Sequence, residues 1–220
     1  MTEANLAARR SIRCLLACSI GLAIAGSAAA TPRVGAPALS ADERAALLAG
    51  ERIERPLRFS TDRGQYVGGL AYQIVRALPH EVLSALSDPD RLPELLPRTQ
   101  SARELESTAT STRVLLTQGA GPFVASYGVE LVRVPDSNEL RFWIDSREPR
   151  DIRDLWGFFR AEPHPDGRSI VTVAVVVDLG DGLVRALFED RVQTMMLRSV
   201  SRIRDVVEPR HLVAGPNGEI

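Results

Sequence analysis

The distribution of apolar and polar positions changes along the chain. A nearly uncharged run at the N-terminus is followed by mixed sequence, then by a series of short β-prone runs, and finally by a stretch in which apolar residues recur every three or four positions. Alternation of apolar and polar residues predicts strands, and a spacing of three or four predicts an amphipathic helix. The pattern therefore predicts strands first and a long helix at the end.

The β-prone runs predict an antiparallel sheet. One strand is expected at 70–75, with a further short strand around 57–59. Gly, Pro, Asp and Asn punctuate the later runs, and such short spacers are typical of consecutive hairpins. The last run is nearly all apolar, so we expect both of its faces to be covered. The later predicted strands are Ala102–Leu105, Thr112–Thr117, Val124–Val134, Leu140–Asp145, Asp154–Glu162 and Ser169–Asp178.

Three short helices precede the main series of strands. Ser40 to Glu43 has the pattern of a capping box, and it predicts a helix that stops at Gly50. Pro79 is expected to start a second helix, because proline is favoured at the first helical position. The third helix follows Asp88 as its N-cap and ends before Pro97.

One long helix is predicted after Gly182. Its apolar residues recur at multiples of three or four, and arginine and acidic residues fill the other side. This spacing predicts a single amphipathic helix of about 26 residues that ends before Pro209. A helix of this length needs a broad apolar surface to lie on, and the sheet supplies one.

The first thirty residues are typical of a secretory signal peptide. A short basic segment precedes an uncharged stretch at 14–30, which ends in small residues with Ala28 and Ala30 in the cleavage-site pattern. We therefore expect an exported protein, periplasmic or extracellular. The alternative is a membrane anchor formed by residues 14–30, since 17 residues lie at the lower edge of the about 17–25 that span a bilayer.

Composition narrows the possible chemistry. The formal net charge is −1, which argues against a nucleic-acid-binding protein, and all 27 basic residues are arginine, so chemistry that needs a catalytic lysine is excluded. Both cysteines, Cys14 and Cys18, lie in the predicted signal peptide. A chain cleaved after Ala30 would have no thiol and no disulfide, and its net charge would be −3.

The order of predicted elements closely resembles the helix-grip fold of the START-like (SRPBCC) superfamily, which includes polyketide cyclase/dehydrases and coenzyme-Q-binding START-like proteins. The sharpest local match runs from Pro79–His80–Glu81–Val82 through Leu86–Ser87–Asp88–Pro89 to Pro97. A second match is Phe159–Pro163 with Asp166–Gly167, although Ala161 stands where the family usually has an aromatic residue.

The resemblance implies an α+β fold. In it, a curved antiparallel sheet of about six to seven strands wraps around the long C-terminal helix, and two short helices follow the first strand. The chain is then divided into a signal peptide or anchor (1–30), a linker with an N-terminal helical extension (31–67), a START-like ligand-binding domain (68–208) and a flexible tail (209–220).

The same resemblance implies a cavity between the sheet and the C-terminal helix that holds a lipid, quinone, sterol or polyketide. Such a site is mostly apolar, with a few polar groups that orient the ligand. The alternative for each candidate is a simple core position. The candidate lining residues are Trp143, Phe159, Val173, Val175, Leu187, Met196 and Val200.

Arg141 and Asp145 are the polar residues to test first. Alternation along the strand places both on the same face as Trp143, and an inward-facing pair would lie beside the cavity. Arg141 would then bind a ligand head group through its guanidinium fork, and both residues are weak candidates for catalysis. The alternative is a solvated loop of balanced charges with little energetic effect.

Other catalytic patterns are missing from the sequence. His80–Glu81 begins like a zinc-binding helix, but Ser84 occupies the place of the second histidine. His164 is predicted in a hairpin turn and His211 in the tail, so we expect no metal, no cofactor and no histidine-based acid–base catalysis in the cavity. A cyclase could use Tyr72, Tyr127, Asp145 or Arg141, although no spacing singles these out.

These patterns favour binding or transport of a hydrophobic small molecule of the lipid, quinone or polyketide class, without catalysis. The first alternative is a cyclase/dehydrase-type enzyme that uses the same cavity, and the second is a protein-interaction module. The expected partner is a hydrophobic small molecule and not a nucleic acid, with transient membrane contact. The sequence predicts no oligomeric state.

Overall fold

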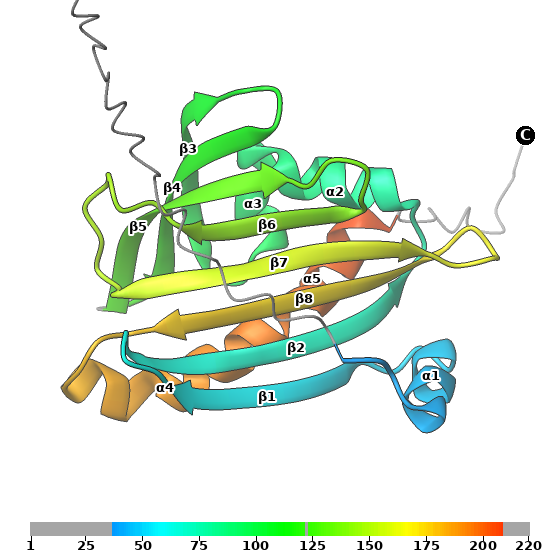
Figure 1. The fold of residues 1–220 in the computed structure, drawn as a ribbon, viewed down its shortest axis with the longest axis horizontal. Helices are drawn as coiled ribbons and strands as arrows, with labels where there is room; N and C mark the ends of the chain where they lie inside the picture. Colours follow the sequence, from blue (N-terminus) through cyan, green and yellow to red (C-terminus); the bar gives the residue numbers. More distant parts are fainter. Residues whose placement is uncertain (1–36, 122, 209–220) are drawn as a thin grey trace, which may run out of the picture. The chain divides into compact units, whose positions relative to one another are not determined.

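One antiparallel sheet of eight strands runs through residues 37–121 and 123–208, which this computed structural model describes (Figure 1). The spatial order of the strands is β1-β2-β8-β7-β6-β5-β4-β3. The predicted signal peptide and tail lie outside the described residues. The strands are β1 (Ile53–Ser60), β2 (Gln65–Val75), β3 (Thr99–Ser107), β4 (Ser111–Ala120), β5 (Phe123–Arg133), β6 (Glu139–Ile144), β7 (Asp154–Pro163) and β8 (Ser169–Asp178).

The predicted fold class is confirmed, with one strand more than expected. Strand β1 pairs along its whole length with β2, from Ile53 opposite Tyr72 to Ser60 opposite Gln65. The sheet therefore begins before residue 68, where the domain was predicted to start. The sequence signal for β1 is weak because the strand contains Pro56 and two arginines, and proline is tolerated at a sheet edge.

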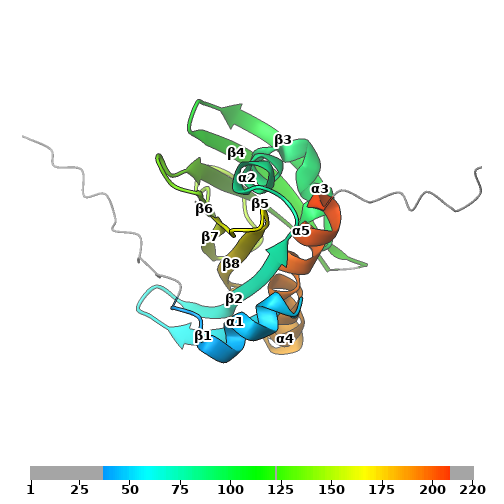
Figure 2. The same ribbon diagram turned by 90° about the vertical axis from the view of Figure 1, so that its right-hand side faces the viewer.

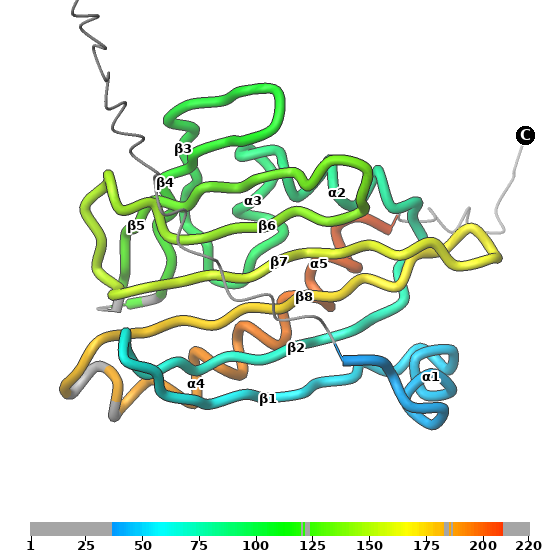
Figure 3. The backbone as a smooth tube through the Cα atoms, viewed as in Figure 1, coloured from blue at the N-terminus to red at the C-terminus, as the bar shows by residue number. Residues whose placement is uncertain are grey.

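The helices lie in three groups along the chain. Figure 3 follows the chain from β2 through α2, η1 and α3 to β3, which is the opposite edge of the sheet. Among the described residues, no helix combines the length and the hydropathy needed to cross a membrane. The helices are α1 (Ala41–Leu48), α2 (Pro79–Ser87), the 3-10 turn η1 (Pro89–Arg91), α3 (Leu92–Leu95), α4 (Leu183–Leu197) and α5 (Ser199–Val207).

The C-terminal helix differs from the prediction because it is divided in two. Helix α4 ends at Leu197, Arg198 lies between the two helices, and α5 begins at Ser199. The Ser199 hydroxyl donates to the Met196 carbonyl at 2.6 Å. A serine hydroxyl that competes for a main-chain carbonyl is a recognised cause of helix bending.

The two faces of the sheet are covered by different helices. Figure 2 shows the sheet curving around α4 and α5, and we call this the concave face. Its core includes Val82, Leu86 and Val200, which are fully buried. On the convex face, Leu47 of α1 packs in a second cluster with residues of β2, β7 and β8. Both faces of β8 are thus covered, as its apolar sequence predicts.

Helix α4 lies directly on the backbone of β1 and β2. The Gln193 side chain donates to the Gly68 carbonyl at 2.8 Å and to the Leu57 carbonyl at 3.1 Å. A Cβ atom at Gly69 would lie 2.3 Å from the Arg55 carbonyl oxygen and 3.0 Å from Leu197 Cδ2. Only glycine fits here, because a side chain would collide mainly with the backbone of the neighbouring strand β1.

The capping box predicted at the start of α1 is present. Ser40 Oγ accepts from the Glu43 amide at 3.2 Å, and Glu43 Oε2 accepts from the Ser40 amide at 2.8 Å. The Arg55 guanidinium binds both Glu43 oxygens, at 2.9 and 2.5 Å. These bonds to Arg55, with those from Ser40, lower the pKa of Glu43 to about 2. The N-terminal helix is therefore tied to the edge strand of the sheet.

Candidate functional site

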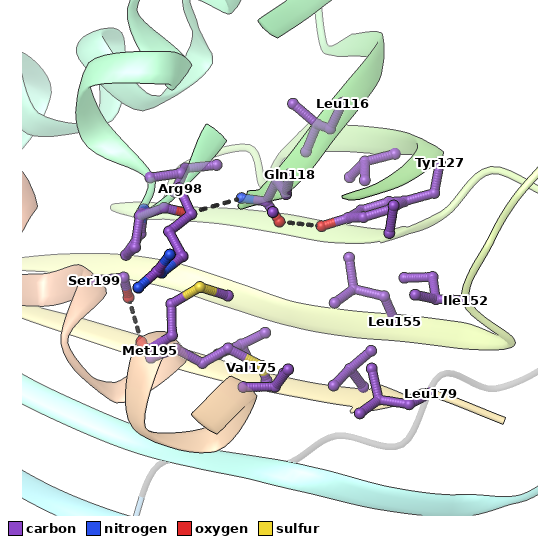
Figure 4. A pocket seen from close by; sticks show the side chains of 18 of the residues that line it. Arg98, Leu116, Gln118, Tyr127, Ile152, Leu155, Val175, Leu179, Met195 and Ser199 are labelled. Atoms are coloured by element: carbon purple, nitrogen blue, oxygen red, sulfur yellow. Dashed lines mark hydrogen bonds between the residues drawn. The ribbon is translucent and has the colours of Figure 1, made fainter. Parts of the chain in front are cut away.

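A cavity of about 1020 Å³ lies between the concave face of the sheet and helix α4. Its volume is at the upper end of the about 300–1,000 Å³ found for small-molecule sites. The walls come mainly from β4 to β8, α4 and the segment around Pro97, as Figure 4 shows for part of the lining. The apolar lining residues include Leu116, Val129, Leu131, Phe142, Leu155, Phe159, Val173, Val175, Val177 and Leu179.

Tyr127 and Gln118 form a polar pair on the wall of the cavity. The Tyr127 hydroxyl donates to Gln118 Oε1 (Figure 4). Gln118 Nε2 donates to Thr99 Oγ1 at 2.7 Å. Burial raises the pKa of the Tyr127 phenol above its usual value of 10.0. The phenol therefore stays protonated at neutral pH, and its oxygen keeps the capacity to accept a hydrogen bond.

Three arginines also line the cavity: Arg98, Arg191 and Arg198. The backbone of Arg98 has a φ of 54°, which is uncommon for a residue other than glycine. The Gly119 amide donates to the Arg98 carbonyl at 2.9 Å and helps hold this conformation. As a result, the Arg98 side chain points toward Met195 and Ser199 across the cavity (Figure 4).

Two carboxylates lie on the cavity lining, and each has a partner. Asp151 Oδ2 accepts from the Ser126 amide at 2.8 Å. Asp190 Oδ1 accepts from Arg58 at 2.5 Å, and this pair is exposed to solvent. The lining therefore combines an apolar majority with a small set of polar groups, an arrangement that suits an amphipathic ligand.

Four of the seven apolar residues predicted from the sequence line the cavity: Phe159, Val173, Val175 and Met196. Trp143 does not, because its neighbour Phe142 faces the cavity and alternate residues of a strand point to opposite faces. Leu187 lies on the outer side of α4 with 63% of its surface exposed. Val200 is fully buried in the core of α5.

Arg141 and Asp145 do not form the predicted pair. Arg141 lies on the convex face and donates to Glu139 Oε1 at 2.6 Å. Asp145 is buried and accepts from Arg113 Nε at 2.6 Å and from Arg147 Nε at 2.8 Å. Neither lines the cavity, because the face of β6 that carries Phe142 is the concave one.

The Asp145 carboxylate is held ionised by its partners. Burial by itself would raise its pKa, but hydrogen bonds from Arg147 and Arg113 outweigh burial and lower the pKa to about 2. Gly128 makes room for this loop, since a Cβ there would lie 2.8 Å from Glu148 Cβ and 3.2 Å from Asp145 Cβ. The network stabilises the loop after β6 and lies outside the cavity.

The remaining candidates for chemistry lie elsewhere. His80 is on α2, and His164 pairs with Asp166 in the β7–β8 hairpin. The Tyr72 hydroxyl donates to the Pro37 carbonyl on the convex side. Residues 37–121 and 123–208 contain no cluster of three or more His, Cys, Asp or Glu placed to hold a metal ion. His211 lies outside the described residues.

The matching family model covers residues 75–200 and is described as polyketide cyclase / dehydrase and lipid transport. A comparison with curated proteins finds no significant match. The matched segment runs from the end of β2 into α5 and so contains every strand that contributes to the cavity.

Solved structures with the same fold come from several bacteria. A STAR-related lipid transfer protein from Xanthomonas axonopodis matches with a TM-score of 0.56 and 13% identity, over 70% of this chain and 98% of its own. The Zhui aromatase/cyclase from Streptomyces sp. R1128 matches with a TM-score of 0.52 and 13% identity, over 70% and 92%. A START superfamily protein from Mycobacterium smegmatis has a TM-score of 0.52 and 12% identity, over 63% and 94%. Identities this low show a shared fold.

Proposed function

The chain belongs to the polyketide cyclase / dehydrase and lipid transport family, and from this premise we propose that it binds and carries a hydrophobic small molecule. The observation that carries the proposal is the cavity of about 1020 Å³ with its mainly apolar lining. Removing the apolar surface of a ligand from water contributes about 25 cal/mol per Å². A site of this volume can bury most of a lipid-sized molecule.

The composition of the cavity walls supports a carrier. Its walls come from β4 to β8 and α4, so the site is formed by the sheet and the helix together. Met195 and Met196 both contribute to the helical wall. Methionine is unbranched and polarizable, so it adapts to apolar ligands of different shape.

A cyclase-type enzyme is the second candidate, because Tyr127 and Gln118 place hydrogen-bonding groups on the cavity wall. Tyr127 already donates its proton to Gln118, and burial raises its pKa, which makes it a poor acid and a poor base at neutral pH. A donor group of the ligand can still bind the Tyr127 oxygen, which keeps an acceptor site. We therefore assign the pair to ligand orientation in the first instance.

The proposal is tested by native mass spectrometry of protein purified without detergent. We expect a co-purifying apolar molecule, or stoichiometric uptake of the neutral dye Nile red, in the wild type. Val175→Trp places an indole in the cavity and should abolish both signals, whereas Leu57→Trp adds the same side chain at an exposed position of β1 that does not line the cavity.

The opposite result would be equally clear. If Val175→Trp folds and binds the dye as the wild type does, the cavity is not the binding site and the carrier proposal fails. Turnover of a polyketide substrate that depends on Tyr127 would instead support the cyclase candidate.

A further inference from the structure

Three arginines line the cavity and are also exposed to solvent. Within residues 37–121 and 123–208, Arg98, Arg191 and Arg198 line the cavity, and none of them forms an ion pair with a carboxylate there. Arg191 lies over the Phe188 ring at 5.8 Å, a contact that leaves its charge unneutralised.

The neighbouring acidic residues of α4 are already occupied. Glu189 binds Arg185 at 2.8 Å and Arg58 at 3.1 Å, and Asp190 binds Arg58 at 2.5 Å. These contacts tie the helix to β1. Asp190 also lies on the cavity lining beside Arg191, but its ion pair is with Arg58.

The arginines approach the cavity from two walls. Arg191 and Arg198 are seven positions apart, with Met195 between them, so all three lie along one stripe of the helix. Arg98 comes from the opposite wall, after α3, and points toward Met195 and Ser199 (Figure 4). Near this end, Arg202 of α5 donates to the Glu94 carbonyl at 2.5 Å, which brings α3 and α5 together.

The backbone conformation of Arg98 is fixed by contacts with the cavity wall. Its φ of 54° is sparsely populated for a side chain of this size and is held by the bond from Gly119. Gln118, whose side chain lies in the cavity, also donates to the neighbouring Pro97 carbonyl at 3.5 Å. The cavity wall itself therefore fixes the backbone from which the guanidinium extends.

The cavity is polarised along its length. Figure 4 shows Ile152 and Leu179 at the end away from Arg98, where the labelled lining is apolar. Asp151 directly precedes Ile152 in the sequence and also lines the cavity. Its Oδ2 accepts from the Ser126 amide. This end of the cavity therefore combines apolar side chains with one carboxylate, and Arg98 lies at the other end.

We propose that the ligand is an amphipathic anion whose carboxylate or phosphate is bound by Arg98, Arg191 and Arg198 while its apolar part fills the cavity. This inference rests on the proposed function and specifies its ligand class. Guanidinium groups bind oxyanions through paired N–H donors, and such charge-assisted bonds are about twice as strong as neutral ones. A bound anion also reduces the electrostatic repulsion among the guanidinium groups.

The test compares ligands that share one acyl chain and differ in the head group. Myristic acid, myristoyl lysophosphatidic acid and myristyl alcohol each displace Nile red from the wild-type protein in a fluorescence titration. We expect an anionic ligand to bind roughly tenfold more tightly than the alcohol, as one charge-assisted hydrogen bond implies. The preferred anion identifies carboxylate or phosphate as the head group, and added salt should reduce the preference.

Matched variants assign the effect to the arginines. Arg98→Gln and Arg198→Gln should each remove most of the preference for the anion, because each weakens binding of the anion more than binding of the alcohol. Arg103→Gln is the control, because Arg103 is an exposed arginine of β3 outside the cavity lining.

The two proposals fail in different ways. If Nile red does not bind the wild type, the cavity carrier itself is wrong. If the dye binds and the anions and the alcohol displace it equally well, the carrier stands and the anionic head group is overturned. Equal loss of preference in Arg98→Gln and Arg103→Gln would also overturn it, since a general surface charge would then account for the effect.

Discussion

The Arg113 guanidinium holds the Asp145 carboxylate, with 2.6 Å between Nε and Oδ2. Arg113 lies on β4 and Asp145 follows β6, so the pair bridges β5, the strand between them. Arg113 also binds Glu106 and Glu148, at 2.9 and 3.0 Å. One side chain thus anchors the loop after β6 to the sheet.

Asp145→Asn should destabilise the fold. The substitution keeps the shape of the side chain but removes the charge that Arg113 and Arg147 bind. Loss of hydrogen bonds between charged groups at a buried site costs about 2–3 kcal/mol. Urea denaturation measures the loss, and Asp136→Asn serves as the control because Asp136 lies in an exposed turn.

The loss of stability in Asp145→Asn should depend on pH. The pKa of Asp145 is lowered from 3.8 to about 2, so its stabilising effect is complete above pH 4 and is lost as the pH falls toward 2. The difference in unfolding free energy between wild type and Asp145→Asn should therefore shrink across that interval. A difference that stays constant from pH 5 to pH 2 would show that the carboxylate charge does not stabilise the fold.

The three tyrosines should titrate abnormally. The chain has three, and burial is the main cause that raises the pKa of each: Tyr66, Tyr72 and Tyr127. Unfolded tyrosine releases its proton near pH 10, so the unfolded state is favoured as the pH rises above that value. We expect little phenolate absorbance in the folded protein at pH 10 and full absorbance in urea. Immediate phenolate formation in the native protein would contradict the buried positions.

Gly69→Leu should disrupt the pairing of β2 with β1 and press against helix α4. A side chain at Gly69 would collide with the Arg55 carbonyl and with Leu197. Overpacking of this kind costs about 1–3 kcal/mol. Chemical denaturation should show the loss, while Glu104→Leu adds the same side chain at an exposed position of β3 and should change little. Wild-type stability for Gly69→Leu would mean that β1 and β2 can accommodate the side chain without cost.

We propose that residues 1–30 are removed during export, as their sequence predicts. The mature protein should then begin at Thr31 and contain no cysteine. Intact-mass measurement of protein from the native host, together with a thiol assay, decides between this outcome and a retained anchor. A mass that includes Cys14 and Cys18 would support the anchor.

Much of the fold follows from local sequence patterns. Strand β8 was predicted with the bounds Ser169–Asp178 that the structure shows, because a continuous apolar run is bounded there by turn-forming residues. The division of the C-terminal helix was missed. The apolar spacing continues across Arg198, and the break depends on a hydrogen bond of Ser199 that periodicity does not report.

The site is harder to predict than the fold for physical reasons. The segment Leu140–Arg141–Phe142–Trp143–Ile144 has large apolar residues on both faces of β6, so alternation alone does not select Phe142 over Trp143. Arg98 carries no sequence signal. Its direction arises from a positive φ that is held by contacts with β4, which is distant in the sequence.

The contact between α4 and β2 has a consequence for where the molecule is hollow. Because Gln193 of α4 donates to the Gly68 and Leu57 carbonyls, the helix lies against β1 and β2, and no residue of these two strands appears on the cavity wall. The helix thus covers one edge of the concave face, and the cavity lies over the remaining strands, β4 to β8.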